Sequence, residues 1–320
     1  MLSLSTGKIL ATIDYKGEKA DKRAKNKCIY VNTNTEDTER PMLDSKVRDT
    51  LIPKSFYNEL KISSHKLIIL KKHIREQTEP DDESLKILYN KANELLDEIL
   101  RKEINFDKKE ATIFPTVPAD SWFGHTAVFG ASGSGKSTWI SHYLTKIKEV
   151  YKGCNIYVFS LVKDDPAYTK SKLNPIYIQI DEDLLDNPLN VKEFAGTPKN
   201  PSIIIFDDSD LHHDKKIADA LELFRDQVLE VGRHKSISAI CVSHVILNQK
   251  HTKKVLNECS RVVLFPANNF ASIQNYLRRY LGFQRDDINF IKNIGKVSRW
   301  CMLCRDYPML VVWETGVKIF

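Results

Sequence analysis

The chain has 320 residues, of which 42% are hydrophobic and 28% are charged. This composition is typical of a globular protein with enough mass for one large or two modest domains. The net charge of +6 is compatible with a nucleic-acid partner but does not require one. No apolar run approaches the ~20 residues of a membrane span, and the N-terminus lacks the basic region and apolar core of a secretory signal. We therefore expect a protein without a membrane span that is not secreted.

Six cysteines are scattered along the chain, and only Cys301 and Cys304 form a close pair. A structural zinc site would need a second pair at suitable spacing, which the sequence does not contain. We interpret these two residues as free thiols within a strand, with metal binding or redox chemistry as the alternative. The cysteine pattern as a whole favours a reducing compartment.

The first 110 residues differ in pattern from the rest of the chain. Short strands are expected at 8–13 and 28–33. Helical periodicity follows over about 55–77 and 82–104, and an acidic turn separates these two segments, which predicts an αα-hairpin. The apolar stripe of this hairpin indicates internal packing, with a partner-binding face as the alternative.

From residue 111 onward strands alternate with helices, which predicts a mostly parallel α/β sheet with crossover helices. The last segments, 297–304 and 309–319, are expected to form a terminal β-hairpin. The predicted division is an N-terminal extension, 1–110, and an α/β domain, 111–320. The expected strands of the sheet are 125–129, 155–160, 176–180, 202–207, 237–243 and 261–265, and the expected helices lie near 136–151, 215–233, 270–281 and 286–293.

Residues 130–137 read Gly-Ala-Ser-Gly-Ser-Gly-Lys-Ser and match the phosphate-binding pattern G-x-x-x-x-G-K-[ST]. A β-prone segment precedes this loop and a helical segment follows it, as the motif requires. Glycines let successive N–H groups turn around an anion, and the helix directs its positive end to the same point. We therefore predict a nucleotide site rather than a simple Gly/Ser turn. Its candidate residues are Gly130, Ala131, Ser132, Gly133, Ser134, Gly135, Lys136, Ser137 and Thr138.

Within this site, Lys136 is expected to reach the β- and γ-phosphates, and the Ser137 hydroxyl is expected to bind Mg²⁺. Two candidate carboxylates, Asp207 and Asp208, stand at the end of the segment 202–208, directly after its apolar residues. A buried parallel strand opens with its carboxyl end onto the ligand crevice. Asp207 is therefore expected to hold the metal and Asp208 to polarise the attacking water. The alternative is a capped strand end without a role in chemistry.

A third element runs from Gly232 to His244 as a basic turn, an apolar strand and a polar pair. Its carboxyl end lies at the same sheet edge as the loop, so Ser243 and His244 can approach the γ-phosphate. Arg233 lies at the other end of the strand. There it cannot easily reach its own nucleotide but can reach that of a neighbouring subunit, where an arginine stabilises the transferring phosphoryl group. The alternatives are a solvated turn for Arg233 and a core or strand-end histidine for His244.

Together these elements resemble the FtsK–HerA superfamily of DNA-pumping ATPases, most closely the genome-packaging ATPases of large double-stranded DNA viruses and their small relatives. The resemblance rests on 128–137, 204–208 and 232–244 and covers about 125–265. It implies a RecA/ASCE-like P-loop fold with ATP and Mg²⁺ as cofactors. It also implies that Asp207 is the Walker B acid, that Arg233 is the arginine finger and that His244 takes the place of a glutamine sensor.

The resemblance further implies a homo-oligomeric ring, commonly a hexamer, that moves double-stranded DNA, with a capsid or portal protein as a further partner. The implied location is the host cytoplasm, a virus factory or the virion. Asp208 departs from the glutamate that is common in the superfamily. A helicase-like or conjugation-type DNA pump is an alternative, as is a small-molecule kinase or nucleotide-gated scaffold. Candidate contacts to DNA phosphates, each with a solvated surface charge as the alternative, are Lys250, Lys253, Lys254, Arg278, Arg279 and Arg285.

Overall fold

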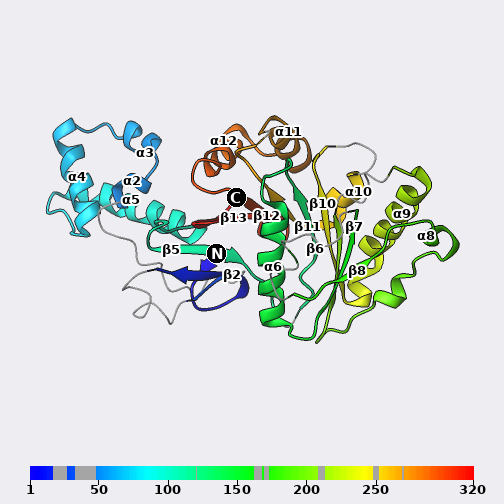
Figure 1. Ribbon diagram of the computed structural model, residues 1–320. Coiled ribbons are helices and arrows are strands. Elements are labelled where there is room, and N and C mark those ends of the chain that lie inside the picture. Colours follow the sequence, from blue (N-terminus) through cyan, green and yellow to red (C-terminus); the bar gives the residue numbers. More distant parts are fainter. Residues whose placement is uncertain are drawn as a thin grey trace.

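The computed structural model describes residues 1–16, 27–32, 48–119, 121–161, 168, 173–207, 213–247, 252–268 and 270–320. In this part, the chain forms one sheet of ten strands and one of four, with helices packed around them (Figure 1). Asp208 and Lys250, to which the sequence gives candidate roles, lie outside the described residues.

The larger sheet contains the predicted parallel strands. Along the sheet they follow the order β11-β6-β10-β9-β7-β8, and every neighbouring pair is parallel. The predicted mostly parallel α/β sheet is therefore confirmed, and β10 lies between β6 and β9. These strands are β6 (His125–Phe129), β7 (Asn155–Ser160), β8 (Ile176–Ile178), β9 (Ser202–Asp207), β10 (Ile237–Ser243) and β11 (Cys259–Leu264).

The parallel strands are apolar along their length because helices cover both faces of the sheet. On β9, Ile203 and Ile205 face one core, whereas Ile204 and Phe206 face another. Helix α6 (Lys136–Val150) packs into the first core. The second core is covered by α9 (Lys215–Val231), α10 (Lys253–Glu258), α11 (Phe270–Leu281) and α12 (Arg285–Ile294). None of the described helices is both long and apolar enough to cross a membrane.

The described part of the chain between β7 and β10 contains short helical turns in addition to β8, β9 and α9. These are α8 (Asp183–Asp186), the 3-10 turn η2 (Val191–Phe194) and the 3-10 turn η4 (Gly232–Lys235). Helix α9 begins where Asp214 accepts hydrogen bonds from the backbone N–H groups of Lys216 and Ile217, an N-cap that fixes the start of the helix.

Antiparallel strands extend the larger sheet beyond β11. They are β12 (Cys301–Cys304), β13 (Leu310–Trp313), β14 (Gly316–Ile319) and β4 (Glu103–Asn105). In place of the expected two-stranded hairpin, the C-terminal segment forms three strands, because a turn at Glu314 and Thr315 divides the second arm. Cys301 and Cys304 are buried free thiols on β12, which agrees with their interpretation as thiols within a strand. Burial raises the pKa of Cys304 to about 11.

The smaller sheet is antiparallel and has the order β1-β3-β2-β5. Its strands are β1 (Leu2–Ser3), β2 (Lys8–Tyr15), β3 (Cys28–Val31) and β5 (Ala111–Pro115). The predicted boundary at residue 110 does not separate the two sheets. Strand β5 follows the boundary but belongs to the smaller sheet, and β4 precedes it but belongs to the larger one. The division into two domains stays a prediction.

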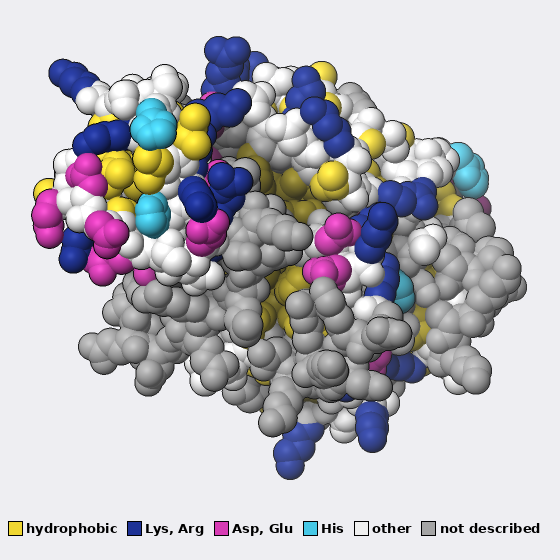
Figure 2. Space-filling model, turned by 90° about the vertical axis from the view of Figure 1, so that its left-hand side faces the viewer, with side chains coloured by type: hydrophobic (Ala, Val, Ile, Leu, Met, Phe, Trp, Pro, Cys, Tyr) yellow, Lys and Arg dark blue, Asp and Glu magenta, His cyan; other side chains and the backbone are white. Residues whose placement is uncertain are grey.

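In the described part of the segment between β3 and β4, four helices surround a core of their own. They are α2 (Arg48–Leu51), α3 (Lys54–Glu59), α4 (Ser64–Glu76) and α5 (Glu83–Lys102). The segment expected as one helix over 55–77 forms two, because the Ser63 side chain accepts a hydrogen bond from the Lys66 N–H and starts α4 anew. Figure 2 shows apolar side chains on the outer surface of this unit among basic and acidic ones. The exposed large apolar residues of the unit include Ile68 on α4 and Ile87 on α5.

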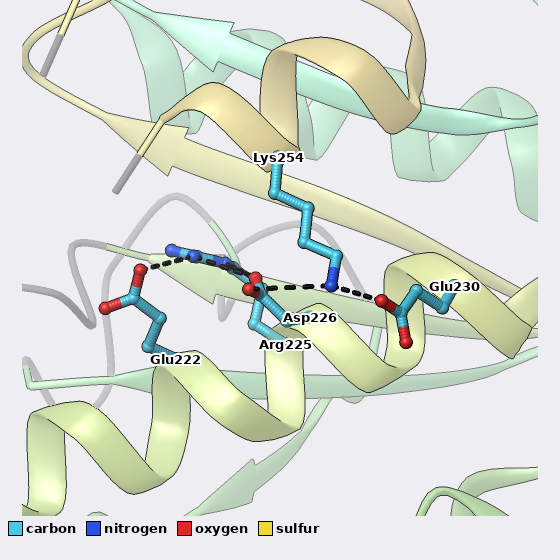
Figure 3. A network of polar contacts seen from close by, with 5 residues as sticks. All are labelled: Glu222, Arg225, Asp226, Glu230 and Lys254. Carbon is cyan, nitrogen blue, oxygen red and sulfur yellow. Dashed lines mark hydrogen bonds and ion pairs between the residues drawn. The ribbon is translucent and has the colours of Figure 1, made fainter. Parts of the chain in front are cut away.

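A network of charged side chains ties α9 to α10 (Figure 3). The buried Arg225 guanidinium donates from Nη2 to Glu222 Oε1 (3.1 Å) and to Asp226 Oδ1 (3.0 Å). The Lys254 ammonium lies 3.8 Å from Asp226 Oδ2 and also pairs with Glu230. Lys254, a candidate DNA contact in the sequence, is therefore engaged by carboxylates of its own chain.

Because His125 is buried on β6, we predict that the free energy of unfolding decreases at acidic pH. Its Nδ1 accepts the Ala239 N–H (2.9 Å), and burial lowers its pKa from 6.5 to about 4. Between these two values unfolding takes up a proton, so stability falls as the pH falls through this window. We expect His125 to account for a loss of about 2 kcal/mol in the free energy of unfolding between pH 7.5 and pH 5.

Urea denaturation of wild type and His125→Gln at the two pH values measures this contribution. The glutamine keeps a hydrogen-bond acceptor but does not titrate. Between the two pH values, the variant should therefore lose about 2 kcal/mol less of its free energy of unfolding than wild type does. Equal losses in both proteins would rule out His125 as the source.

Candidate nucleotide-binding site

The glycine-rich loop joins β6 to α6 at the carboxyl edge of the parallel strands. Gly133 (φ 72°) and Gly135 (φ 103°) have left-handed backbone angles, which strongly favour glycine. A Cβ on Gly130 would lie 2.5 Å from Ser134 Oγ and 2.8 Å from Phe265 Cδ2, so this position has no room for a side chain. All three glycines of the motif are thus required by the shape of the loop.

Lys136 begins α6 and is only 9% exposed. Its ammonium donates to the Gly130 carbonyl oxygen (2.8 Å) and lies 3.2 Å from His244 Nδ1. This ring nitrogen accepts the bond when the imidazole is neutral and protonated at Nε2. An ammonium inside the curve of the loop, next to a helix N-terminus, creates a positive potential that suits a polyphosphate.

The register of the sheet brings the three sequence motifs to one edge. Ser243 on β10 is paired with Phe129 on β6, and Val242 is paired with Asp207 on β9. The Gly130 N–H donates to the Ser243 carbonyl oxygen (3.2 Å), which fastens the start of the loop to the end of β10. His244 therefore lies at the loop, as the direction of its strand predicts.

Asp207 and Ser137 are the described residues to which the sequence gives the role of magnesium ligands. Both are half-buried, and carboxylate and hydroxyl oxygens are the hard ligands that Mg²⁺ prefers, with phosphate oxygens and water completing the shell. Asp207 Oδ2 accepts a hydrogen bond from the Tyr168 hydroxyl (3.3 Å). Among the described residues, no group of three or more His, Cys, Asp or Glu side chains is placed so that it could hold a metal ion.

The remaining predicted loop residues differ in accessibility. Ser134 is buried, whereas Ala131, Ser132 and Thr138 are exposed. A loop of this kind contacts phosphate mainly through its backbone N–H groups. Exposure of these side chains is therefore compatible with a ligand held by the backbone.

Arg233 lies at the opposite edge of the sheet. It is exposed on η4 and is separated from His244 by the length of β10, about 20 Å. It borders a cavity of about 360 Å³ whose lining also includes Trp122, Tyr151 and Lys199. The strand direction read from the sequence therefore places Arg233 correctly, away from the phosphate loop of its own chain.

Tyr168, Phe265 and Arg299 contact parts of the site but were not identified from the sequence, because they belong to no motif and come from distant segments. Tyr168 contacts Asp207. Phe265, just after β11, and Arg299, just before β12, both lie beside the loop: a Cβ on Gly135 would be 3.8 Å from Phe265 Cε1 and 3.8 Å from Arg299 Nη2. Only the tertiary fold brings them there.

The strand order and the loop motif together are those of a P-loop NTPase fold of the RecA/ASCE-like type. A phosphate loop follows β6, an acid ends β9, and β10 lies between these two strands and ends in His244. The three strand ends meet at the edge where Lys136 lies.

Comparison with known proteins finds a viral sequence relative and distantly similar solved structures. No model of a known protein family matches the sequence. The uncharacterized protein V3 of the Sputnik virophage is 31% identical over 195 residues, which are 60% of this chain and 75% of that protein.

Among solved structures, the DNA-packaging ATPase B204 of Sulfolobus turreted icosahedral virus is similar over 60% of this chain and 96% of its own (16% identity, TM-score 0.44). The cytoplasmic domain of the type VII secretion ATPase EccC of Thermomonospora curvata is similar over 68% of this chain and 28% of its own (13% identity, TM-score 0.40). Both structural similarities are too distant to carry an activity to this chain.

Replacing the loop lysine tests the nucleotide site. Lys136→Ala removes the ammonium that faces the bound phosphates, and we expect affinity for a non-hydrolysable ATP analogue to fall at least about tenfold. Isothermal titration calorimetry measures the affinity. Lys152→Ala, an exposed lysine beyond the far end of α6, is the matched control and should bind as wild type does. Tight binding by Lys136→Ala would place the nucleotide elsewhere.

Proposed function

We propose that this chain, which belongs to the family of the Sputnik virophage V3 protein, is an ATP-driven translocase of double-stranded DNA that packages a viral genome into a capsid. The observation that carries the proposal is the division of the site between two sheet edges. The phosphate loop, Asp207 and His244 meet at one edge, and Arg233 lies at the other. Such a subunit offers its arginine to a neighbour, as in the ring-forming FtsK–HerA superfamily that its motifs resemble.

The residues of the first edge divide the binding of ATP between them. The loop N–H groups and Lys136 would hold the β- and γ-phosphates. Ser137 and Asp207 would hold Mg²⁺, which when bound neutralises charge that develops on the phosphate oxygens. We assign to Asp208 the polarisation of the attacking water. His244, in contact with Lys136, holds the position of the sensor that reports the state of the γ-phosphate.

Arg233 completes the site of the next subunit in a homo-oligomeric ring, commonly a hexamer in the superfamily. A guanidinium at that point stabilises the charge of the transferring phosphoryl group. Hydrolysis at subunit interfaces would then shift loops that hold the DNA backbone through phosphate contacts, which makes binding sensitive to salt and tolerant of sequence. Lys253, Arg278, Arg279 and Arg285 are exposed and available for such contacts.

The viral source of the V3 relative supports genome packaging among the DNA-moving functions. A capsid or portal protein is then a further partner. The place of action is the host cytoplasm, a virus factory or the virion.

The proposed translocation predicts ATP hydrolysis that depends on duplex DNA. We expect long linear duplex to raise the rate of phosphate release at least about tenfold, and the stimulation to fall steeply with added salt because the contacts are to phosphates. Steady-state phosphate release by wild type and Lys136→Ala, each with and without duplex, measures it. A wild-type rate of hydrolysis that does not change with duplex DNA would contradict the proposed translocase and favour a kinase or scaffold. Strand separation in a fork assay would favour a helicase.

The proposed trans role of Arg233 predicts complementation between two inactive variants. Arg233→Ala and Lys136→Ala should each lose hydrolysis, because each lacks one half of every site. Mixed rings should regain part of it, since an interface between an intact Lys136 and an intact Arg233 forms again. The matched control mixes Arg233→Ala with the double variant, which contributes no arginine and should stay inactive. Full activity of Arg233→Ala alone would exclude the trans arginine.

A further inference from the structure

We infer that Arg299 binds the nucleotide phosphates in the same subunit as the loop that holds them. The inference rests on the proposed nucleotide site and adds to it a second cation, from a segment without a sequence motif. A Cβ on Gly135 would lie 3.8 Å from Nη2 and 4.0 Å from Cζ of Arg299. Gly135 is the residue before Lys136 and the N-cap of α6, so the guanidinium lies at the mouth of the loop.

The backbone around Arg299 is fixed on both sides. Ser298 Oγ donates to the Trp300 carbonyl oxygen (2.6 Å) and accepts the Glu314 N–H (3.2 Å). The Trp300 ring packs against Phe114 (centroids 5.4 Å apart) and against Trp139 of α6 (6.0 Å). Ser298 and Trp300 are buried, whereas Arg299 between them is exposed. The segment is thus attached to the helix that carries Lys136, while the arginine side chain stays accessible to a ligand.

The charges around Arg299 favour an anion. No hydrogen bond or ion pair joins the guanidinium to another residue in the part of the chain that the structure describes. Its neighbours at the loop are the N-terminus of α6, the ring of Phe265 and the loop that holds the Lys136 ammonium. Because no carboxylate of the described residues neutralises this guanidinium, a polyphosphate held at the N-terminus of α6 would be attracted to it.

The shape of the guanidinium suits this ligand. Its planar fork of N–H donors can form two parallel hydrogen bonds to phosphate oxygens, a fixed geometry that the ammonium of a lysine does not provide. Arg299 and Arg233 would then serve different nucleotides, the first in its own subunit and the second in the neighbour.

Binding of a non-hydrolysable ATP analogue without DNA, measured by isothermal titration calorimetry, tests the inference. Arg299→Ala should weaken binding about 10- to 100-fold, the effect of losing a charge-assisted hydrogen bond, and Arg299→Lys should recover part of it. Lys296→Ala is the matched control, because it removes one exposed positive charge from the same segment, and it should stay within about twofold of wild type. Melting temperatures without nucleotide should be the same for all variants.

The outcomes separate this inference from the nucleotide site itself. Equal affinities for Arg299→Ala and Lys296→Ala would overturn the role of Arg299 and leave the site intact, provided that Lys136→Ala still loses binding. A wild type that does not bind the analogue would overturn both. Mixing Arg299→Ala with Lys136→Ala gives the test of position: an arginine acting in its own subunit predicts no regained hydrolysis, and regained hydrolysis would contradict it.

Discussion

Parallel pairing of β6, β10 and β9 is the constraint on which the site depends. Parallel strands end at one edge of a sheet, so three segments far apart in the chain deliver the phosphate loop, His244 and Asp207 to one place. The same pairing sends η4, and Arg233 with it, to the other edge. One sheet therefore gives the subunit two unlike edges, one that holds a nucleotide and one that presents a cation.

The helices make this arrangement possible by burying both faces of the sheet. Helix α6 covers one face and carries Lys136 at its first residue, so the packing that stabilises the sheet also aims the lysine. On the other face, the network of Arg225, Asp226 and Lys254 holds α9 against α10. Helix α9 leads into η4, and α10 follows the segment after His244. The two sheet edges are thus connected through the same layer of helices.

Much of the site could be predicted because its signals are local. A glycine pattern, an apolar run that ends in acids, and a strand that ends in Ser243 and His244 each specify an element and its direction. Arg299, Phe265 and Tyr168 could not be predicted, since nothing near them in sequence marks their position and only the fold brings them to the loop. The division of 55–77 into α3 and α4 depends on the Ser63 cap, a short signal within a continuous helical periodicity. The exchange of β4 and β5 between the sheets depends on long-range pairing that periodicity does not reveal.

Helix α5 passes into β4 without a loop between them, since one ends at Lys102 and the other begins at Glu103. Strand β4 pairs with β14 at the outer end of the large sheet. A helix of 20 residues is about 30 Å long, so it has the dimensions of a lever arm that starts at an edge strand. Tilting that strand by about 10° would carry the far end of the helix through about 5 Å, on the scale of one helical turn. Small rearrangements within the sheet would be magnified at the helical unit.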